Sequence, residues 1–303
     1  MEEKREGMNI QWYPGHMTKT RRMIQDQLKH IDAVCEILDA RIPISSRNPD
    51  VEELTAGKPR LIVLNRIDVA DPAGTKAWAD YFHSQGCAVL EVNAKEGRGT
   101  DRFPAAVREL LAEKLAAYAE RGQAGRTIRV MILGIPNVGK STFINKVSKR
   151  KTAKAENRPG VTRSKQWVPV DASLDLLDTP GMLWPKFEDQ TVGMNLAYTG
   201  AVRDEIMDIE TLSCHLMTYL ARRYPQALMS GYKLPELPER EEGENDVGYG
   251  YRLLEAAGRK RGFLISGGEV NTERMARILL DEFRGGKLGR FTLELPEDIE
   301  ERA

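Results

Sequence analysis

Short apolar runs alternate with amphipathic stretches over the first 181 residues of the chain. Apolar runs bounded by Gly, Pro, Asn or Asp are typical of strands buried on both faces, and they predict strands at 31–40, 60–65, 87–94, 127–134, 166–170 and 174–178. Apolar residues at helical spacing predict helices at 17–30, 49–56, 72–85, 101–120 and 141–149. This alternation predicts an α/β domain in which a mostly parallel sheet carries helices on both faces.

The pattern changes to helical spacing after Gly181. Residues 204–224 repeat apolar side chains at the interval of an α-helix, at Ile206, Ile209, Leu212, Leu216 and Leu220. Further helices are predicted at 251–262 and at 271–286, where Asn271 is placed as an N-cap and Gly285-Gly286 as a stop. The acidic stretch 235–246 is predicted to be a solvated loop. We therefore expect a sheet domain over residues 1–190 and a small, mostly helical domain over residues 191–303.

Composition narrows the class of protein. Lys plus Arg and Asp plus Glu are each 45, so net charge gives no indication of a nucleic-acid partner. The three cysteines form no C-x-x-C pair and the four histidines have no ligand spacing, which argues against a disulfide framework or a zinc site. No apolar run approaches the roughly 20 residues of a membrane span, and the start MEEKREG lacks the apolar core of a secretory signal. We expect a soluble, cytoplasmic protein without a membrane span.

The sequence GIPNVGKS at 134–141 fits the pattern G-x-x-x-x-G-K-S between a predicted strand and a predicted helix. Backbone N–H groups of such a loop surround a β-phosphate at the helix N-terminus, whereas a turn that merely contains glycines would not need this register. Lys140 is expected to neutralise β- and γ-phosphate oxygens, and Ser141 to bind Mg²⁺. The residues expected around the phosphates are Pro136, Asn137, Val138, Gly139, Lys140, Ser141 and Thr142.

Two further motifs would complete the phosphate end of the site. Asp178-Thr-Pro-Gly181 ends the last predicted strand, where the Asp178 carboxylate can hold Mg²⁺ through water and the Gly181 N–H can reach a γ-phosphate. PGVT at 159–162 supplies Thr162 as a second hydroxyl ligand for Mg²⁺, in a segment that orders around the nucleotide. Each motif alone is weak evidence for a nucleotide site. Because both follow a predicted phosphate loop, together they support one.

Guanine recognition is indicated by LIVLNRID at 61–68. A carboxylate that accepts from guanine N1–H and N2–H₂ selects guanine over adenine, because leaving such groups unpaired costs about 1–3 kcal/mol each. Asp68 is placed for this role, Asn65 can bridge the base and neighbouring loops, and the stem of Arg66 can cover the base. The tripeptide Asn93-Ala94-Lys95, after the next strand, resembles the Ser-Ala-Lys motif that meets guanine O6 through a backbone N–H.

The order of these motifs is unusual, because the guanine-binding motifs precede the phosphate loop. All of them follow strands, at the edge where open α/β sheets bind ligands, so one site can still form in space. The order resembles that of the circularly permuted GTPases. The sequences QWYPGHM at 11–17, LDARIPISSRNP at 38–49 and DTPGMLWP at 178–185 are similar to motifs of the bacterial ribosome biogenesis GTPase A family.

This resemblance covers roughly residues 9–200 through motifs, and the helical tail through its size and position. It implies a GTP-hydrolysing protein that acts in late assembly of the large ribosomal subunit and whose C-terminal helical domain engages ribosomal RNA. One departure is Arg66, because the family usually has Lys there. A guanidinium also stacks well, so we expect altered nucleotide affinity and retained specificity.

The group that activates the water is less obvious. Many GTPases place a Gln directly after D-x-x-G, but this chain has Met182. The permuted order brings the helix at 17–30 beside DTPG, so His16 is a candidate for positioning the water; alternatively, it caps the helix or packs on the loop. The family resemblance links this histidine to hydrolysis and favours the first role. In GTPases with an Asn matching Asn137, K⁺ lies near the phosphates, so Asn137 is a candidate K⁺ ligand.

Basic residues cluster at four places, at 19–22, 146–165, 259–261 and 287–290. Charge runs are usually solvated faces, but several together on a neutral protein favour RNA as a partner. The cluster at 146–165 contains Thr162, so we expect the bound nucleotide to control whether these basic residues are accessible to RNA. The helical domain follows DTPG closely in sequence, so a change in the DTPG loop could reorient that domain.

We expect a monomeric, Mg²⁺-dependent GTPase that binds precursors of the large ribosomal subunit and their ribosomal RNA. One alternative is a nucleotide-gated RNA-binding scaffold whose hydrolysis is incidental, which Met182 favours. The other is a P-loop kinase of a small molecule, which would not need Asn65 and Asp68.

Overall fold

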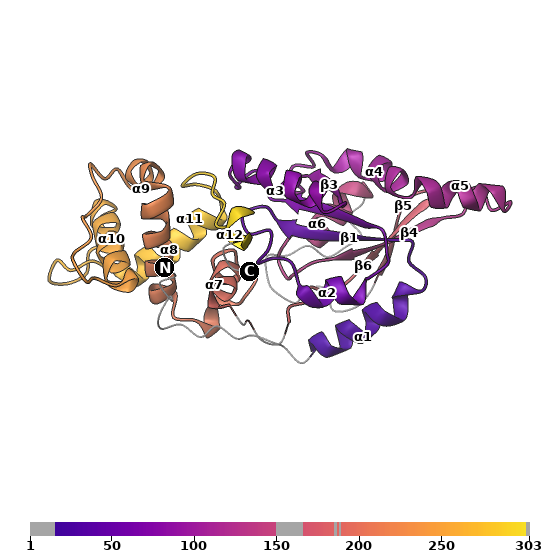
Figure 1. The fold of residues 1–303 in the computed structure, drawn as a ribbon. Coiled ribbons are helices and arrows are strands. Elements are labelled where there is room, and N and C mark those ends of the chain that lie inside the picture. The colour runs from indigo at the N-terminus through magenta and orange to yellow at the C-terminus, as the bar shows by residue number, and fades with distance from the viewer. Residues whose placement is uncertain (1–15, 150–165, 185–186, 188, 301–303) are drawn as a thin grey trace. The chain divides into compact units, whose positions relative to one another are not determined.

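The structure is a computed structural model that describes residues 16–149, 166–184, 187 and 189–300. Within this part, the chain separates into two compact units (Figure 1). The described residues from 16 to 184 and from 292 to 300 form the sheet unit. Those from 187 to 291 form the helical unit.

The last segment of the chain differs from the expected helical domain over 191–303. Residues 292–300 pack with the sheet unit, because hydrogen bonds fix them there. Leu293 N donates to Arg41 O at 2.8 Å, and Trp78 Nε1 donates to Glu294 O at 2.8 Å. The helical unit is therefore an insertion that begins at Phe187 and ends at Phe291.

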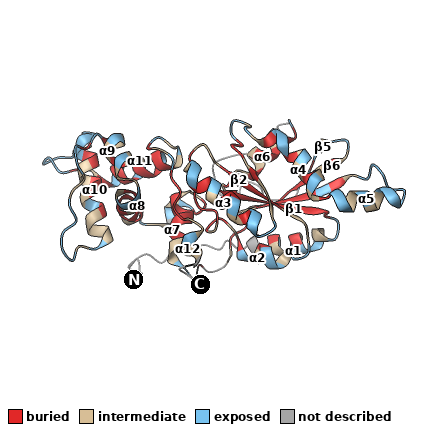
Figure 2. Ribbon diagram, turned by 45° about the horizontal axis from the view of Figure 1, so that its top comes forward, coloured by how far each residue is buried: buried red, intermediate tan, exposed pale blue. Residues whose placement is uncertain are grey.

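The described part of the sheet unit contains one sheet in the strand order β3-β2-β1-β4-β6-β5. The strands are β1 (Ala33–Asp39), β2 (Arg60–Asn65), β3 (Ala88–Glu91), β4 (Ile128–Leu133), β5 (Gln166–Asp171) and β6 (Leu174–Asp178). Neighbouring strands are parallel except for the β5–β6 pair, which is antiparallel. Every residue of β1 is buried (Figure 2), as expected of a central parallel strand. The expected α/β fold is confirmed.

Helices cover both faces of this sheet (Figures 1 and 2). The helices of the sheet unit are α1 (His16–Leu28), α2 (Pro49–Leu54), α3 (Pro72–Ser84), α4 (Phe103–Leu110), α5 (Ala112–Glu120), α6 (Lys140–Val147) and α12 (Glu297–Glu300), with a 3₁₀ turn η1 (Thr100–Arg102). On one face, Ile24 of α1 and Val51 of α2 enter a cluster with Met131 of β4. On the other, Phe103 of α4 meets Phe143 of α6 edge to face, with ring centroids 5.1 Å apart.

The expected helix at 101–120 is interrupted. Leu111 has φ −103° and ψ 12°, which ends α4 and starts α5. The apolar periodicity continues through this break, so the sequence pattern gave no sign of it.

The helical unit contains α7 (Gln190–Tyr198), η2 (Asp204–Ile206), α8 (Ile209–Arg223), α9 (Pro225–Tyr232), α10 (Asp246–Lys260) and α11 (Thr272–Arg284). Gly250 of α10 packs directly on the backbone of Cys214 in α8, where a side chain would collide with it. Asn271 caps α11 as expected, since its side chain accepts from Arg274 N at 2.9 Å. In neither unit does a described helix combine the length and apolar character needed to cross a membrane.

Candidate nucleotide site

The strand order reverses between β1 and β4, the point at which open α/β sheets bind ligands beyond the carboxyl ends of their strands. The loops after β1, β2, β3, β4 and β6 all begin at this edge of the sheet. The site residues predicted from position 65 to position 181 lie in these loops, at the strand ends that precede them or in the first turn of α6. Thr162 is the exception, because it lies outside the described residues. Helix α1 begins at His16, but the side chain of His16 lies outside the description as well.

Two glycines shape the loop between β4 and α6. Gly134 has φ +151°, and a Cβ there would lie 2.6 Å from Ile37 O. Gly139 has φ +98°, and a Cβ there would collide with the side-chain amide of Asn65. Only glycine combines these backbone angles with such close neighbours. The phosphate loop is therefore pressed against both β1 and the guanine-binding loop.

The charged groups at the start of α6 are buried together. Lys140 donates through Nζ to Gly134 O at 3.1 Å and to Ile135 O at 2.7 Å. Burial lowers the pKa of Lys140 to about 8, and nearby Asp178 opposes this shift. Burial also raises the pKa of Asp178, against the influence of Lys140 and of Ser141, whose Oγ lies 3.4 Å from Asp178 Oδ2.

Asp178 has one oxygen available for a cation. Its Oδ1 is buried and forms no hydrogen bond with the described residues, and buried polar atoms of this kind are rare in native proteins. No cluster of three or more metal-binding side chains exists in the described chain. Mg²⁺ at nucleotide sites needs only one or two protein ligands beside phosphates and waters, so Asp178 and Ser141 fit such an ion.

Asn65 joins the loops predicted to bind guanine to the predicted phosphate loop. Its Nδ2 donates to Val138 O at 2.8 Å, and its Oδ1 accepts from Ala94 N at 3.0 Å. Asn65 is 1% exposed, so both bonds are protected from water. Asn93 is also buried, and its Oδ1 accepts from Glu96 N at 3.3 Å, which folds the loop that carries Ala94.

Asp68 follows at the open end of the same loop. Its Oδ1 is buried and has no hydrogen-bond partner among the described residues. A buried carboxylate oxygen without a donor is costly, and guanine N1–H and N2–H₂ are donors that would satisfy it. The arrangement can therefore select guanine by pairing an acceptor that the folded chain leaves open.

Arg66 lies near other charged side chains, those of Arg41, Asp39 and Asp68. It has φ +69°, an uncommon conformation for a side chain other than glycine. Burial lowers the pKa of Arg66, and the charge of Arg41 lowers it further, against Asp39 and Asp68. Burial works to raise the pKa of Asp39, but Arg41 and then Arg66 outweigh it and hold that pKa low.

The DTPG loop is packed on the phosphate loop. A Cβ at Gly181 would lie 2.7 Å from both N and Cα of Pro136. Met182 N donates to Gly134 O at 3.3 Å, while the Met182 side chain is 3% exposed in a core cluster with Ile24 of α1. Met182 therefore anchors the loop in the core, and α1 occupies the expected place beside DTPG.

The loop after β1, residues 39–48, has a role that the sequence did not assign. Ala40 N donates to Asn65 O at 2.8 Å, and Asn48 Nδ2 donates to Met182 O at 3.1 Å. This loop thus contacts both the predicted guanine-binding loop, through Asn65, and the DTPG loop, through Met182. Its position after a buried strand at the switch point is the signal that could have indicated this.

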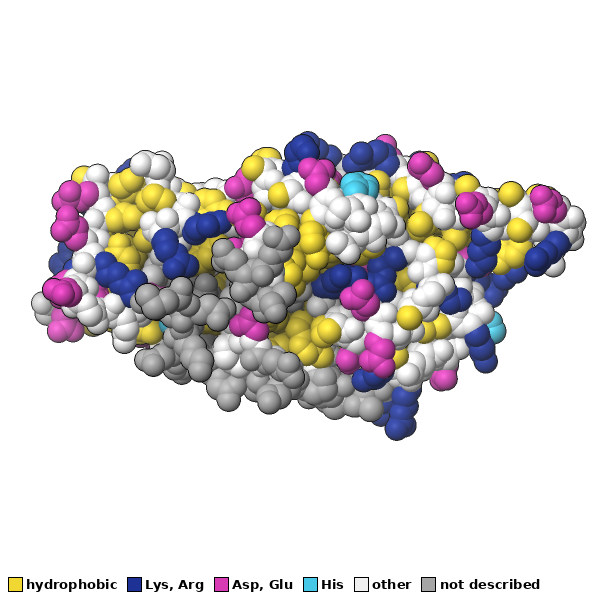
Figure 3. Space-filling view, viewed as in Figure 1, with side chains coloured by type: hydrophobic (Ala, Val, Ile, Leu, Met, Phe, Trp, Pro, Cys, Tyr) yellow, Lys and Arg dark blue, Asp and Glu magenta, His cyan; other side chains and the backbone are white. Residues whose placement is uncertain are grey.

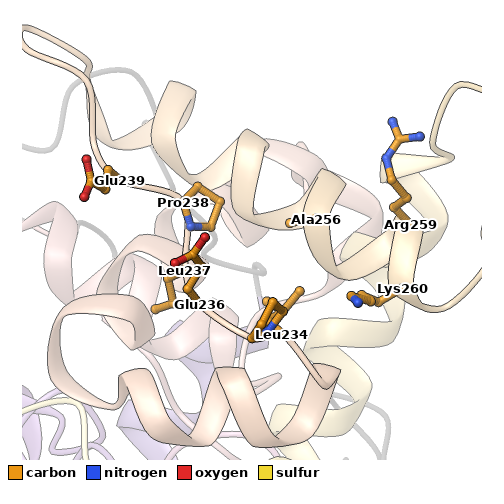
Figure 4. A pocket seen from close by; sticks show the side chains of 9 residues that line it. Leu234, Glu236, Leu237, Pro238, Glu239, Ala256, Arg259 and Lys260 are labelled. Carbon is orange, nitrogen blue, oxygen red and sulfur yellow. The ribbon is translucent and has the colours of Figure 1, made fainter.

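A groove of about 800 Å³ lies in the helical unit and includes none of the predicted nucleotide residues. Figure 4 shows the segment 234–239 on one side and Ala256, Arg259 and Lys260 of α10 on the other. Two glutamates and two basic residues line it, so its charge is mixed. The predicted nucleotide residues lie instead at the edge of the sheet.

Comparisons with known proteins agree with this arrangement. A family model described as 50S ribosome-binding GTPase matches residues 129–223. Ribosome biogenesis GTPase A of Bacillus cereus is 45% identical over 295 residues, which cover 97% of this chain and 97% of that protein. The chain belongs to the ribosome biogenesis GTPase A family.

Other members and relatives are more distant. Ribosome biogenesis GTPase A of Thermotoga maritima is 30% identical over 290 residues, with 96% of each chain covered. Mitochondrial ribosome-associated GTPase 1 of Mus musculus is 33% identical over 298 residues, which cover 93% of this chain and 89% of that protein.

Two solved structures of YlqF are also similar. The GDP-bound structure has a TM-score of 0.60 at 28% identity and covers 91% of this chain and 100% of that chain. The GNP-bound structure from T. maritima has a TM-score of 0.59 at 28% identity, with 92% and 99% covered. The family resemblance predicted from the motifs is confirmed, and the ribosome biogenesis GTPase A family accounts for guanine-binding motifs that precede the phosphate loop.

Proposed function

We propose that this chain is a Mg²⁺-dependent GTPase that acts in late assembly of the large ribosomal subunit, with its nucleotide state controlling binding to ribosomal RNA. The observation that carries the proposal is the side chain of Asn65, which joins Val138 of the phosphate loop to Ala94 of the guanine-binding loops. These contacts bring the guanine-binding and phosphate-binding motifs together despite their permuted order, which supports one guanine-nucleotide site. The names of the relatives, which refer to ribosomes, give the setting.

In this proposal, one set of residues binds the guanine base and another set binds the phosphates. Asp68 pairs with guanine N1–H and N2–H₂, Arg66 covers the base, and the backbone around Ala94 and Lys95 donates to O6. The residues from Pro136 to Thr142 surround the phosphates, with the Lys140 ammonium neutralising charge as the γ-phosphate leaves. Gly181 N–H donates to the γ-phosphate, so the DTPG loop distinguishes GTP from GDP.

The same residues suggest where metal ions would bind. Asp178 and Ser141 would hold Mg²⁺, with Asp178 acting through water and Thr162 as a further ligand. Bound Mg²⁺ neutralises charge on the β- and γ-phosphates. Asn137, at φ +59° in the phosphate loop, is the proposed K⁺ ligand, and hydrolysis that is equally fast in Na⁺ and in K⁺ would contradict that assignment.

His16 is the proposed residue that positions the attacking water, since Met182 is turned into the core. The His16→Ala variant is expected to hydrolyse GTP about 100-fold more slowly in single-turnover measurements, with GTP affinity unchanged. His30→Ala is the matched control, because His30 is exposed just beyond the other end of α1. Equal rates for both variants, with and without ribosomal particles, would assign His16 a structural role.

Lys140 gives nucleotide binding a pH dependence. Its pKa is about 8 in the free protein because it is buried, and phosphate oxygens favour the charged ammonium. Binding above pH 8 must then include uptake of a proton, so GDP affinity is expected to fall by up to about tenfold per pH unit there. Calorimetry in two buffers of different ionisation enthalpy measures this uptake.

The matched variant is Lys140→Arg, because a guanidinium stays charged throughout this range. It is expected to bind GDP without proton uptake. Equal proton uptake in the wild-type and variant proteins would show that another group titrates.

Two observations support ribosomal RNA as the binding partner: the names of the relatives and the distribution of basic residues. Lys and Arg side chains occur at several separate places among acidic ones on the face shown in Figure 3. Lys260, Lys287 and Arg290 are exposed in the helical unit, whereas Arg261 is paired with Glu282 at 2.9 Å. We propose that the exposed residues contact ribosomal RNA, together with the basic segment 150–165, which lies outside the described residues. A monomer acting in the cytoplasm is the setting proposed for this binding.

The proposed function is tested by measuring nucleotide selectivity together with binding to precursors of the large ribosomal subunit. The proposed GTPase binds GTP in preference to ATP, sediments with large-subunit precursors in a GTP analogue more than in GDP, and hydrolyses GTP faster when those particles are present. Nucleotide-dependent sedimentation without any stimulation of hydrolysis would favour the RNA-binding scaffold instead. Equal binding of GTP and ATP would contradict the guanine site.

A further inference from the structure

Loop 39–48 is held by buried polar contacts along most of its length. Ser45 and Ser46 are 0% exposed and Asn48 is 1% exposed. Ser46 Oγ accepts from Asp39 N at 3.0 Å, and the carboxylate of Asp39 accepts from Arg41 Nε at 2.9 Å and Arg41 Nη2 at 2.6 Å. Such a buried network moves as a unit, because each broken bond leaves a buried polar group unpaired at a cost of about 1–3 kcal/mol.

The same loop holds the segment that returns from the helical unit. Ser45 N donates to Glu294 Oε1 at 2.7 Å, and Ser45 Oγ donates to Glu294 Oε2 at 2.6 Å. Glu294 is 3% exposed and follows the junction at residue 292 by two positions. Leu293 N adds a third bond, to Arg41 O.

The loop also holds the segment that leads into the helical unit. Asn48 Nδ2 donates to Met182 O at 3.1 Å, and the helical unit begins at Phe187, five positions after Met182. Met182 in turn directly follows Gly181, the proposed γ-phosphate contact. Among the described residues, the segments on both sides of the helical unit, before Phe187 and after Phe291, are thus held by one loop. That loop also reaches the predicted guanine end, because Ala40 N donates to Asn65 O.

We propose that loop 39–48 couples the nucleotide to both connections of the helical unit, with Asn48 and Glu294 as its positioning residues. A change at Gly181 between GDP and GTP is passed through Met182 O and Asn48 to the loop, and from Ser45 to Glu294. The proposal rests on the proposed function in one respect, that a guanine nucleotide occupies the site. The coupling must be reciprocal, so loosening Glu294 must also alter nucleotide affinity.

Hydrogen exchange of the wild-type protein tests whether the bound nucleotide changes the order of loop 39–48 and of the segment that contains Glu294. Amide exchange in peptides covering 42–48 and 291–296 is expected to be about fivefold slower with a GTP analogue than with GDP. Exchange that is the same in both nucleotide states, at saturating nucleotide, would overturn the coupling and leave the proposed GTPase intact. Failure to bind guanine nucleotides would overturn the proposed function and the coupling with it.

Variants at Glu294 test whether this contact in turn changes nucleotide affinity. Glu294→Ala is expected to lower GTP-analogue affinity about fivefold relative to GDP affinity, because only the γ-phosphate requires an ordered DTPG loop. Glu294→Gln can still accept from Ser45 N–H and donate to Ser45 Oγ, so it should restore the wild-type ratio. Glu297→Ala, at an exposed position of the same segment, is the matched control and should leave the ratio unchanged.

A merely structural role for Glu294 would lower the melting temperature and leave the ratio of the two affinities unchanged. That result for Glu294→Ala would overturn the proposal. If Glu294→Ala does not fold, the Ser45→Ala variant tests the proposal instead, because it removes the bond from Ser45 Oγ to Glu294 and keeps the bond from Ser45 N. A folded Ser45→Ala protein with the wild-type ratio would overturn the proposal equally.

Discussion

The Asp68→Asn variant is expected to lose its preference for guanine nucleotides and to bind xanthine nucleotides instead. The Asp68 carboxylate has a buried oxygen that no described residue contacts by a hydrogen bond, and guanine offers N1–H and N2–H₂ as donors. An asparagine presents one acceptor and one donor. Xanthine presents a donor at N1 and a carbonyl oxygen at C2, which match that pair.

The loss for guanine should be about 3 kcal/mol, or roughly 100-fold in affinity, because hydrogen bonds to a charged group are the stronger kind. Competition binding of GDP and XDP measures both affinities. Asp71→Asn is the matched control three residues later, since Asp71 caps α3 by accepting from Ala73 N and an asparagine caps equally well. If Asp68→Asn still prefers GDP to XDP, Asp68 does not recognise the base.

The Gly181→Ala variant is expected to hydrolyse GTP about 100-fold more slowly while binding GDP nearly as tightly as the wild-type protein. The added methyl group would lie 2.7 Å from N and Cα of Pro136 and 3.1 Å from the carbonyl carbon of Ile135. These are backbone atoms of the phosphate loop, so the DTPG loop must move away. The Gly181 N–H would then lose its proposed contact with the γ-phosphate, which GDP lacks.

Gly248→Ala is the control for this substitution. Gly248 lies in α10, and a Cβ there would meet only side-chain atoms, the nearest being Asn245 Oδ1 at 3.3 Å. Its hydrolysis rate should equal that of the wild-type protein. A Gly181→Ala enzyme that hydrolyses GTP at the wild-type rate would show that the γ-phosphate is sensed elsewhere.

Local patterns were sufficient to predict most of the fold. The buried strands produce continuous apolar runs such as LIVLN at 61–65, and each nucleotide motif directly follows such a run. Because the ends of parallel strands meet at one edge, the position of Asn65 beside Val138 was predictable although 73 residues separate them.

Three features were beyond local patterns. The run FTLELP at 291–296 is too short to assign, and its place depends on hydrogen bonds that Ser45, 249 residues away, donates to the Glu294 carboxylate. The inward direction of Met182 depends on α1 covering the loop, which a position beside D-x-x-G does not reveal. The roles of Ser45 and Asn48 required their partners to be known, since polar residues in a loop usually face water.

The distance in sequence between Ser45 and Glu294 has a consequence for biosynthesis. Chains are made from the N-terminus at about 5–20 residues per second, so roughly 12–50 seconds separate the synthesis of these two partners. During that interval loop 39–48 lacks the carboxylate that accepts from Ser45 N and Oγ in the finished protein. The nascent chain therefore completes its sheet unit only when residues 292–300 are made, after the described helical unit of residues 187–291.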